Sequence, residues 1–119
     1  MKAAAISEFG GLDVLHVTDV KEPTAAPGEV VLRVLCAGMN HLDIWVRRGR
    51  PGSQLQMPHV LGSDAVGVVT AVGEGVSSPK LGERVIVYPG LSCGQCEFCR
   101  RGEQSLCVDF GIEIGRAHV

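Results

Sequence analysis

Residues 93–107 read CGQCEFCRRGEQSLC, and this stretch places four cysteines within fifteen residues. Cys93, Cys96, Cys99 and Cys107 follow the spacing Cys-x2-Cys-x2-Cys-x7-Cys. Four thiolates this close together are typical of a closed tetrahedral metal site, most often one for Zn2+. Such a site leaves no coordination position open for a substrate. The stretch therefore predicts a structural zinc lobe, which orders the chain around the metal and performs no chemistry itself.

Two other interpretations of the cysteines compete with zinc. The run Cys-x2-Cys-x2-Cys resembles the start of a bacterial ferredoxin motif for an iron–sulfur cluster, but that motif continues with x3-Cys-Pro and uses a second run. Here the last gap is seven residues, and Val108 follows Cys107. Disulfides or a redox thiol pair are the other alternative, and they are less expected in a cytoplasmic protein, whose thiols stay reduced.

Zinc also accounts for how so polar a segment could fold. Metal binding to thiolates supplies about 10–16 kcal/mol of apparent free energy in small zinc modules. The segment has few large apolar residues of its own, and Gly94 and Gly102 permit tight turns around a metal. The fifth cysteine, Cys36, lies in an apolar segment, where we expect an inert core residue.

The composition is that of a globular domain. The chain has 119 residues, of which 45% are hydrophobic and 20% charged, with a net charge of −2. This length suits one domain, and the charge offers no basic face for nucleic acid. The Arg47, Arg48 and Arg50 cluster is expected in a solvated turn. No apolar stretch approaches a membrane span, and the first residues lack a secretory signal, so we expect a cytoplasmic location.

Short apolar and β-branched segments alternate with Gly- and Pro-rich turns. We expect strands at residues 2–6, 13–20, 29–37, 65–72 and 84–88. Gly67, inside the fourth of these, predicts a bulge or a close backbone approach. One helix is expected at residues 41–48, with Asn40 as its N-cap, Asp43 at N3 and Gly49 after its end. Several short strands and one small helix indicate a mainly β, barrel-like domain.

Four stretches of the chain resemble one known family. They are MKAAAISEFGG with VLHVTDV after it, PGEVVLRVLCAGMNHLDIWVRRG, MPHVLGSDAVGVVTAVGEGV and the cysteine segment. Together they resemble the N-terminal domain of zinc-containing medium-chain alcohol dehydrogenases and their quinone oxidoreductase-like relatives. The resemblance implies a mainly β fold over residues 1–119: a GroES-like, partly open β-barrel with a short helix and a zinc lobe at residues 91–110. In the family a Rossmann domain that binds NAD or NADP follows. We find no glycine fingerprint for one here and expect that domain beyond residue 119.

The resemblance breaks down where the family binds its catalytic zinc. Aligning GMNHLD with the family's Gly-x-Cys-x-Thr-Asp places Asn40 at the Cys ligand and Leu42 at the hydroxyl that relays the alcohol proton. Aligning LGSDAVGVV with the Gly-His-Glu segment places Ser63 at the His ligand and Asp64 at the Glu. Amide and hydroxyl oxygens bind Zn2+ poorly beside thiolate and imidazole. The resemblance thus implies a structural zinc without a catalytic one.

The same alignment implies roles for four residues. Asn40 would hydrogen-bond the nicotinamide ribose or the substrate carbonyl, in addition to capping the helix. Asp43 and Asp64 are the other candidate catalytic residues, each with a purely structural alternative: helix stabilisation for Asp43 and a surface position for Asp64. His41 aligns with a position near the cofactor phosphates. His59, after Pro58, is expected in a loop.

The function that the resemblance implies is NAD(P)-dependent hydride transfer on a small carbonyl, enone, quinone or alcohol. Zinc-free relatives with an Asn at the same helix start reduce activated carbonyls or enones, because hydrogen bonds can take the place of a Lewis acid there. Two alternatives remain. One is a zinc-stabilised GroES-like binding module without catalysis, and the other is an alcohol dehydrogenase with an atypical catalytic zinc site. The resemblance also allows a homo-oligomer, and it implies neither a nucleic-acid nor a membrane partner.

Overall fold

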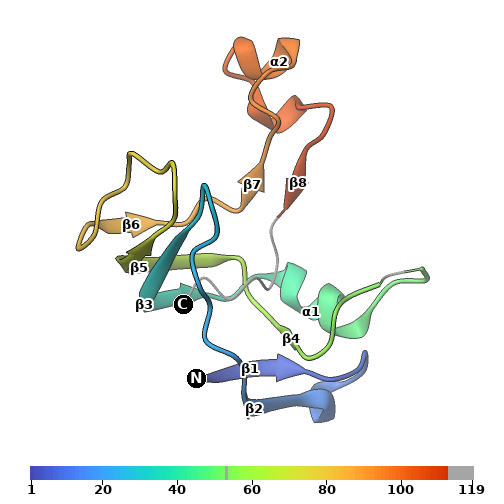
Figure 1. The fold of residues 1–119 in the computed structure, drawn as a ribbon. Helices are drawn as coiled ribbons and strands as arrows, with labels where there is room; N and C mark the ends of the chain where they lie inside the picture. Colours follow the sequence, from blue (N-terminus) through green and yellow to red (C-terminus); the bar gives the residue numbers. More distant parts are fainter. Residues whose placement is uncertain (53, 113–119) are drawn as a thin grey trace.

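A computed structural model describes residues 1–52 and 54–112 of the chain. Its strands form three small antiparallel sheets, with strand orders β2-β1-β4, β3-β5-β6 and β7-β8 (Figure 1). The strands are β1 (Lys2–Ile6), β2 (Leu15–Asp19), β3 (Val30–Gly38), β4 (His59–Val60), β5 (Asp64–Val72), β6 (Arg84–Ile86), β7 (Gly90–Leu91) and β8 (Gly111–Ile112). The helices are α1 (His41–Arg48), α2 (Glu97–Arg100) and the short 3-10 helices η1 (Leu12–Val14) and η2 (Gln104–Leu106). The expected mainly β fold is confirmed, and so is the short helix expected at residues 41–48, although the described residues also form α2, η1 and η2.

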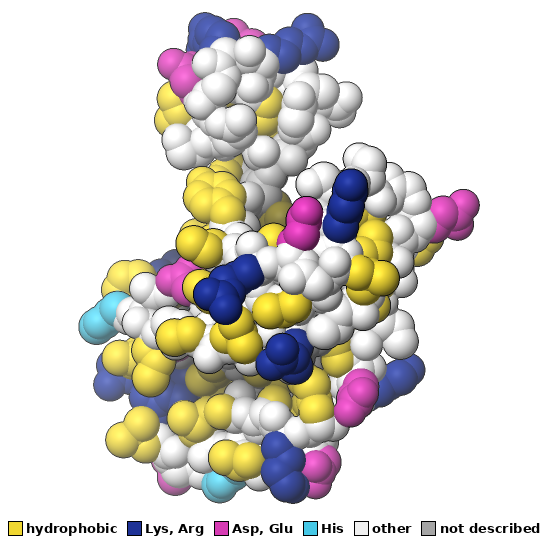
Figure 2. All heavy atoms as spheres, turned by 90° about the vertical axis from the view of Figure 1, so that its left-hand side faces the viewer, with side chains coloured by type: hydrophobic (Ala, Val, Ile, Leu, Met, Phe, Trp, Pro, Cys, Tyr) yellow, Lys and Arg dark blue, Asp and Glu magenta, His cyan; other side chains and the backbone are white. Residues whose placement is uncertain are grey.

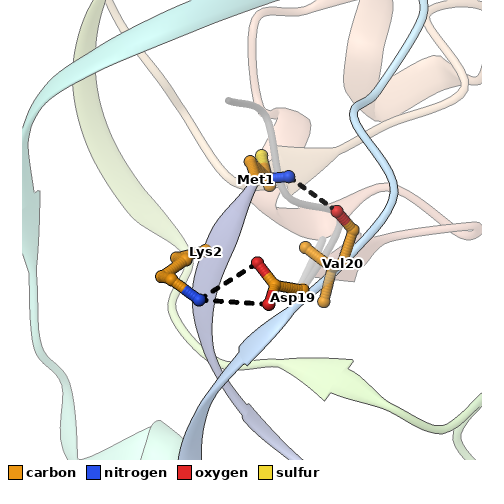
Figure 3. Close-up of polar contacts among 4 residues, drawn as sticks. All are labelled: Met1, Lys2, Asp19 and Val20. Atoms are coloured by element: carbon orange, nitrogen blue, oxygen red, sulfur yellow. Dashed lines mark hydrogen bonds and ion pairs between the residues drawn. The ribbon is translucent and has the colours of Figure 1, made fainter.

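Strands β1 and β2 form a hairpin in the lower sheet of Figure 1, where β4 pairs with the other side of β1. Its open end is fixed by two backbone hydrogen bonds, from the Met1 ammonium to the Val20 carbonyl oxygen (2.9 Å) and from the Val20 N–H back to the Met1 carbonyl oxygen (2.8 Å). The Lys2 ammonium adds a salt bridge to Asp19 at 3.0 Å (Figure 3). Both side chains of that pair are 70% or more exposed, so it contributes at most about 1 kcal/mol.

The β3–β5 pair is the longest ladder and leads the chain to α1. Its register shifts between Val34 and Cys36, where Leu35 is an extra residue in β3. From Leu35 to Gly38 every residue of β3 is exposed. Cys36 is among them, and the expectation of a buried core cysteine is wrong. The close backbone approach predicted at Gly67 is confirmed, since a Cβ there would lie 2.9 Å from the Arg33 carbonyl oxygen.

Several element boundaries differ from the expectations. The second strand begins at Leu15 because residues 12–14 form η1, and the strand from Arg84 ends at Ile86. Helix α2 and the two-residue strands β4, β7 and β8 were not predicted, because segments this short carry no periodicity of their own. Residues 111–119 carry little sequence pattern. Gly111 and Ile112 form β8, and residues 113–119 lie outside the described residues. Within the described ranges no helix is long and apolar enough to cross a membrane.

The buried core is small. Its apolar members in the two larger sheets and η1 are Ala5, Ile6, Val14, Leu32 and Val69. Many large apolar side chains are instead exposed, and they are spread over the sheets and around the narrow connection to the cysteine lobe, as the yellow side chains in Figure 2 show. Exposed apolar surface on this scale is typical of a domain that packs against further protein.

Three polar side chains are buried with this core, namely Asp43, Arg47 and His59. The Arg47 guanidinium donates to the Gly10 carbonyl oxygen at 3.2 Å, and the Gly10 N–H donates to the Arg47 carbonyl oxygen at 2.9 Å. This tie joins α1 to the segment after β1, so the expectation of a solvated Arg47 is wrong. His59 lies in β4, not in a loop, and pairs with Ile6 of β1.

His59 is expected to make the stability of the domain depend on pH. Burial lowers the pKa of His59, and its Nε2 atom has no hydrogen-bond partner among the described residues. A lowered pKa in the folded state means that the unfolded chain binds the proton more tightly. The contribution of His59 to the free energy of unfolding should therefore be greatest above pH 6.5. It should decrease as the pH drops below that value, by at most about 1.4 kcal/mol per pH unit.

Urea unfolding between pH 5 and 8 checks this. His59→Gln should flatten the dependence below pH 6.5, and His16→Gln, at an exposed position of β2, is the control. A wild-type curve as flat as that of His59→Gln would contradict the prediction.

Candidate functional site

The four cysteines of the predicted metal site come together at the end of a narrow stalk. Strands β7 and β8 form the stalk, and α2 and η2 form the lobe above it (Figure 1). Cys96 is the N-cap of α2, Cys99 lies within α2, and Cys107 follows η2. Gly94 and Gly102 have φ values of 72° and 80°, which confirms the two tight turns expected there. No two of these cysteines form a disulfide.

The geometry of the four sulfurs suits zinc. Their Sγ atoms all lie within 4.8 Å of one another, and no other group of three or more His, Cys, Asp or Glu side chains in the described ranges comes close enough to hold a metal. A tetrahedron with Zn–S distances of about 2.3 Å has edges of about 3.8 Å. A small contraction would therefore bring all four sulfurs to an ion at the centre.

The electrostatics of the lobe also suit a cation. Backbone N–H groups of Cys93 and Cys96 donate to the Sγ atoms of Cys107 and Cys93, each at 3.3 Å, and the N–H of Asp109 donates to Cys107 at 3.4 Å. The backbone N–H of Cys99 lowers the pKa of Cys96 to about 6, whereas loss of contact with water raises the pKa of Cys99 to about 11. A cation bound among the sulfurs would stabilise the thiolate form that binds a metal. The residues present fit zinc.

The second candidate site lies where β3 ends and α1 begins. Asn40 has an extended backbone (φ −121°, ψ 157°) and precedes the helix, as expected for its N-cap. Its side chain does more than cap, because Nδ2 donates to the Asp64 carboxylate at 2.6 Å, across 24 residues of sequence. Both side chains are exposed. The structure thus brings two of the three predicted catalytic residues into direct contact on the surface.

Asp43 holds the backbone on both sides of the Asn40–Asp64 hydrogen bond. It is buried, and its two carboxylate oxygens accept the backbone N–H groups of Asn40 (2.8 Å) and Gly62 (2.9 Å). The bond to Asn40 is one half of the predicted capping box, and the Asn40 side chain, which accepts from the Asp43 backbone, forms the other half. The bond to Gly62 joins the helix start to the residues that lead into β5, and so it sets the distance between Asn40 and Asp64. Sequence reasoning did not identify Gly62 as a partner, since a backbone N–H leaves no compositional signal.

His41, the predicted cofactor residue, is the first residue of α1 and is exposed. Its ring lies edge-on to that of Trp45, with ring centroids 4.9 Å apart and an interplanar angle of 69°. The Arg50 guanidinium lies 5.6 Å from the centre of the same indole ring. An imidazole, an indole and a guanidinium are thus grouped on the exposed side of α1, adjoining Asn40.

The fold and the cysteine lobe together define a class of protein. The chain belongs to the alcohol dehydrogenase GroES-like domain family, whose sequence pattern matches residues 26–118. The family assignment made from the sequence is therefore confirmed.

Among individual proteins, the chain is 35% identical over 108 residues to an alcohol dehydrogenase of Geobacillus stearothermophilus, which covers 90% of this chain and 31% of that protein. Two solved structures are also similar. One is an NAD-dependent alcohol dehydrogenase (46% identity, TM-score 0.85, 97% of this chain and 34% of that chain). The other is a cobalt- and zinc-bound thermostable alcohol dehydrogenase from Pyrobaculum aerophilum (40%, TM-score 0.84, 96% and 34%). The chain spans about a third of the length of these relatives.

Proposed function

We propose that this chain is the GroES-like domain of an NAD(P)-dependent oxidoreductase that acts on a small carbonyl, enone, quinone or alcohol, with one structural zinc and no catalytic zinc. The hydrogen bond between Asn40 and Asp64 carries the proposal. It lies where the resemblance to the family predicts the catalytic zinc, and it links two side chains that replace zinc-site residues there. An amide nitrogen that donates to a carboxylate offers no lone pair to a metal.

In the proposed site the chain's own residues supply polar contacts to the substrate. The Asn40 side chain retains one N–H for a ligand, because its other Nδ2–H is directed at Asp64 and its carbonyl oxygen is part of the capping box of α1. Asp43 holds the helix start in place through two backbone N–H groups. His41 is at the exposed start of α1, where a helix N-terminus and an imidazole favour an anionic cofactor group. The nicotinamide cofactor, when bound, supplies or accepts the hydride.

The cofactor domain is proposed to lie outside this chain. Two observations support this: the relatives are about three times as long, and the domain exposes many large apolar side chains, among them Leu35, Met39, Ile86 and Tyr88. In this arrangement Cys93, Cys96, Cys99 and Cys107 would hold the structural zinc. The metal would order the lobe and take no part in the reaction, since four thiolates leave it no open position.

Metal content distinguishes the proposal from a conventional alcohol dehydrogenase. We expect the full-length protein to contain about one zinc ion per chain, because four thiolates form one closed site. The double variant Asn40→Cys/Ser63→His should gain up to a second ion, whereas Asn40→Ala should keep the first. Elemental analysis of the purified proteins measures this. Two zinc ions in the wild type would refute the absence of a catalytic zinc.

Activity tests the other half of the proposal. The full-length protein should oxidise NADH or NADPH with an enone or quinone, and Asn40→Ala should lower turnover by about tenfold or more. The variant should remain folded, with a loss of about 1 kcal/mol for the missing N-cap. A protein with one zinc that neither binds nor oxidises a nicotinamide cofactor would instead be a zinc-stabilised binding module. The exposed Leu106 and Val108 on the lobe favour that second function, because they offer an apolar contact surface.

A further inference from the structure

The four cysteines of the lobe differ in their access to solvent. Cys99 and Cys107 are buried, with exposed fractions of 8% and 6%, whereas Cys93 and Cys96 are half-buried. The Cys107 Sγ atom is also held from inside the lobe, because it accepts the backbone N–H groups of Cys93 (3.3 Å) and Asp109 (3.4 Å). A reagent that arrives from solution therefore reaches Cys93 and Cys96 before the other two.

Cys93 and Cys96 are also a close pair. Gly94, with a φ of 72°, turns the chain between them, and the Cys96 N–H donates to the Cys93 Sγ atom at 3.3 Å. The two sulfurs lie within 4.8 Å of each other. Redox-active thiol pairs have the same Cys-x-x-Cys spacing. The zinc site and the redox thiol pair that the sequence offered as alternatives are therefore compatible, as two states of the same residues.

Zinc ligation would keep both sulfurs reactive, because a metal binds and stabilises thiolates, and the thiolate is the form that attacks an oxidant. A disulfide has lost the charge that makes a thiolate a ligand. The lobe has little else to order it once the metal leaves. Its large apolar side chains Leu91 and Leu106 are exposed, and the strands of its stalk, β7 and β8, are two residues long.

We propose that Cys93 and Cys96 form an oxidation site, at which a hydroperoxide converts both thiolates to a disulfide and so releases the zinc and opens the lobe. One thiolate attacks a peroxide oxygen, the O–O bond breaks, and the alkoxide or hydroxide that leaves takes a proton from water. The second thiolate attacks the sulfenic acid so formed: the S–S bond forms, the S–O bond breaks and hydroxide leaves. The two sulfurs lose two electrons, and the peroxide gains them. This inference rests on the structural zinc of the proposed function and does not involve Asn40 or Asp64.

The test treats the zinc-loaded full-length protein with a few-fold excess of hydrogen peroxide and follows released zinc with a chromogenic chelator. The cysteines are then mapped by alkylation, trypsin digestion and mass spectrometry. Trypsin yields residues 85–100, with the first three cysteines of the cluster, and residues 102–116, with the fourth. A Cys93–Cys96 disulfide makes the first peptide lighter by two hydrogens and leaves one alkylated cysteine in it, whereas any bond to Cys107 would cross-link the two peptides.

Cys93→His is the test variant, since a Cys3His set still forms a closed zinc site but lacks one of the two accessible thiolates. Its zinc should be released about tenfold more slowly or more, because Cys96 then has only buried thiolates as partners. Cys36→Ser removes an exposed thiol outside the cluster and is the matched control. It should release about one zinc ion per chain as fast as the wild type, and a thiol reductant with added zinc should restore both proteins.

Three results would overturn the inference while leaving the structural zinc standing. They are full zinc retention by peroxide-treated wild type, a first disulfide that includes Cys99 or Cys107, and release from Cys93→His as fast as from the wild type. Where Cys93→His binds less than one zinc ion, the peptide map of the wild type decides between the outcomes. A wild type that binds no zinc before oxidation would overturn both the inference and the structural zinc of the proposed function.

Discussion

In Cys96→Ser, the zinc content should fall from about one ion per chain to nearly none, and the lobe at residues 91–110 should unfold. Each Sγ atom is one of four within 4.8 Å, and a serine hydroxyl is a much poorer ligand for this borderline-soft ion. The lobe has little else to hold it, because its large apolar side chains Leu91 and Leu106 are exposed. Of the about 10–16 kcal/mol that a structural zinc supplies in small modules, we expect at least about 3 kcal/mol to be lost.

The arginines of the lobe make the unfolding measurable. Arg100 ends α2 and Arg101 follows it, and trypsin cuts there only when the backbone opens locally. Cleavage at these bonds should become about tenfold faster or more in Cys96→Ser, and in wild-type protein treated with a zinc chelator. The two three-stranded sheets should remain folded, because the lobe is connected to them through the two-residue strands β7 and β8.

Cys36→Ser is the matched control. Cys36 is an exposed cysteine of β3 outside the cluster, so its replacement should change the zinc content not at all and the stability by less than about 0.5 kcal/mol. Full zinc content and wild-type resistance to trypsin in Cys96→Ser would show that the four thiols do not form a metal site.

Features fixed by neighbouring residues were predictable from the sequence. The bounds of α1 agree with the expectation at both ends, because its N-cap Asn40, its N3 residue Asp43 and its terminal Gly49 lie within ten residues. The cysteine spacing likewise predicted a cluster that the structure assembles. In both cases the residues that form the sequence pattern are close in sequence and also contact one another in the structure.

Features fixed by pairing between distant segments were not predictable. Cys36 lies in the end of β3 that the fold leaves exposed, and apolar composition alone cannot reveal which end of a strand other segments cover. His59 becomes buried because a two-residue strand pairs with β1, some fifty residues earlier in the chain. At the candidate site the sequence named Asn40, Asp43 and Asp64 separately. Only the fold shows that Asp64 binds the Asn40 side chain while Asp43 holds its backbone.

Gly73→Ala should destabilise the domain by about 3 kcal/mol, the upper end of the usual range for overpacking, because the conflict is with backbone. Gly73 follows β5, and its N–H donates to the Glu29 carbonyl oxygen at 2.8 Å. A Cβ at Gly73 would run into the Ala26 carbonyl oxygen and would lie 3.0 Å from the Glu29 carbonyl oxygen. The obstacle is backbone on both sides, so no side chain can rotate to relieve it. The turn before β3 would have to move away from the end of β5.

Gly75→Ala separates this clash from the general effect of removing a glycine. Gly75 lies two residues further along the same turn with φ of 80°, but nothing is within 4 Å of where its Cβ would be. Its replacement should cost only the about 1–2 kcal/mol of a left-handed backbone with a side chain. Urea unfolding of the two variants beside the wild type measures the difference. Equal losses would mean that the turn yields freely and that the contact between the start of β3 and the end of β5 is not a rigid part of the fold. A loss at Gly73 that exceeds the loss at Gly75 by about 1 kcal/mol or more would show that this contact fixes one end of the β3–β5 ladder. Gly38 pairs with Asp64 at the other end of the same ladder, so the candidate site depends on it.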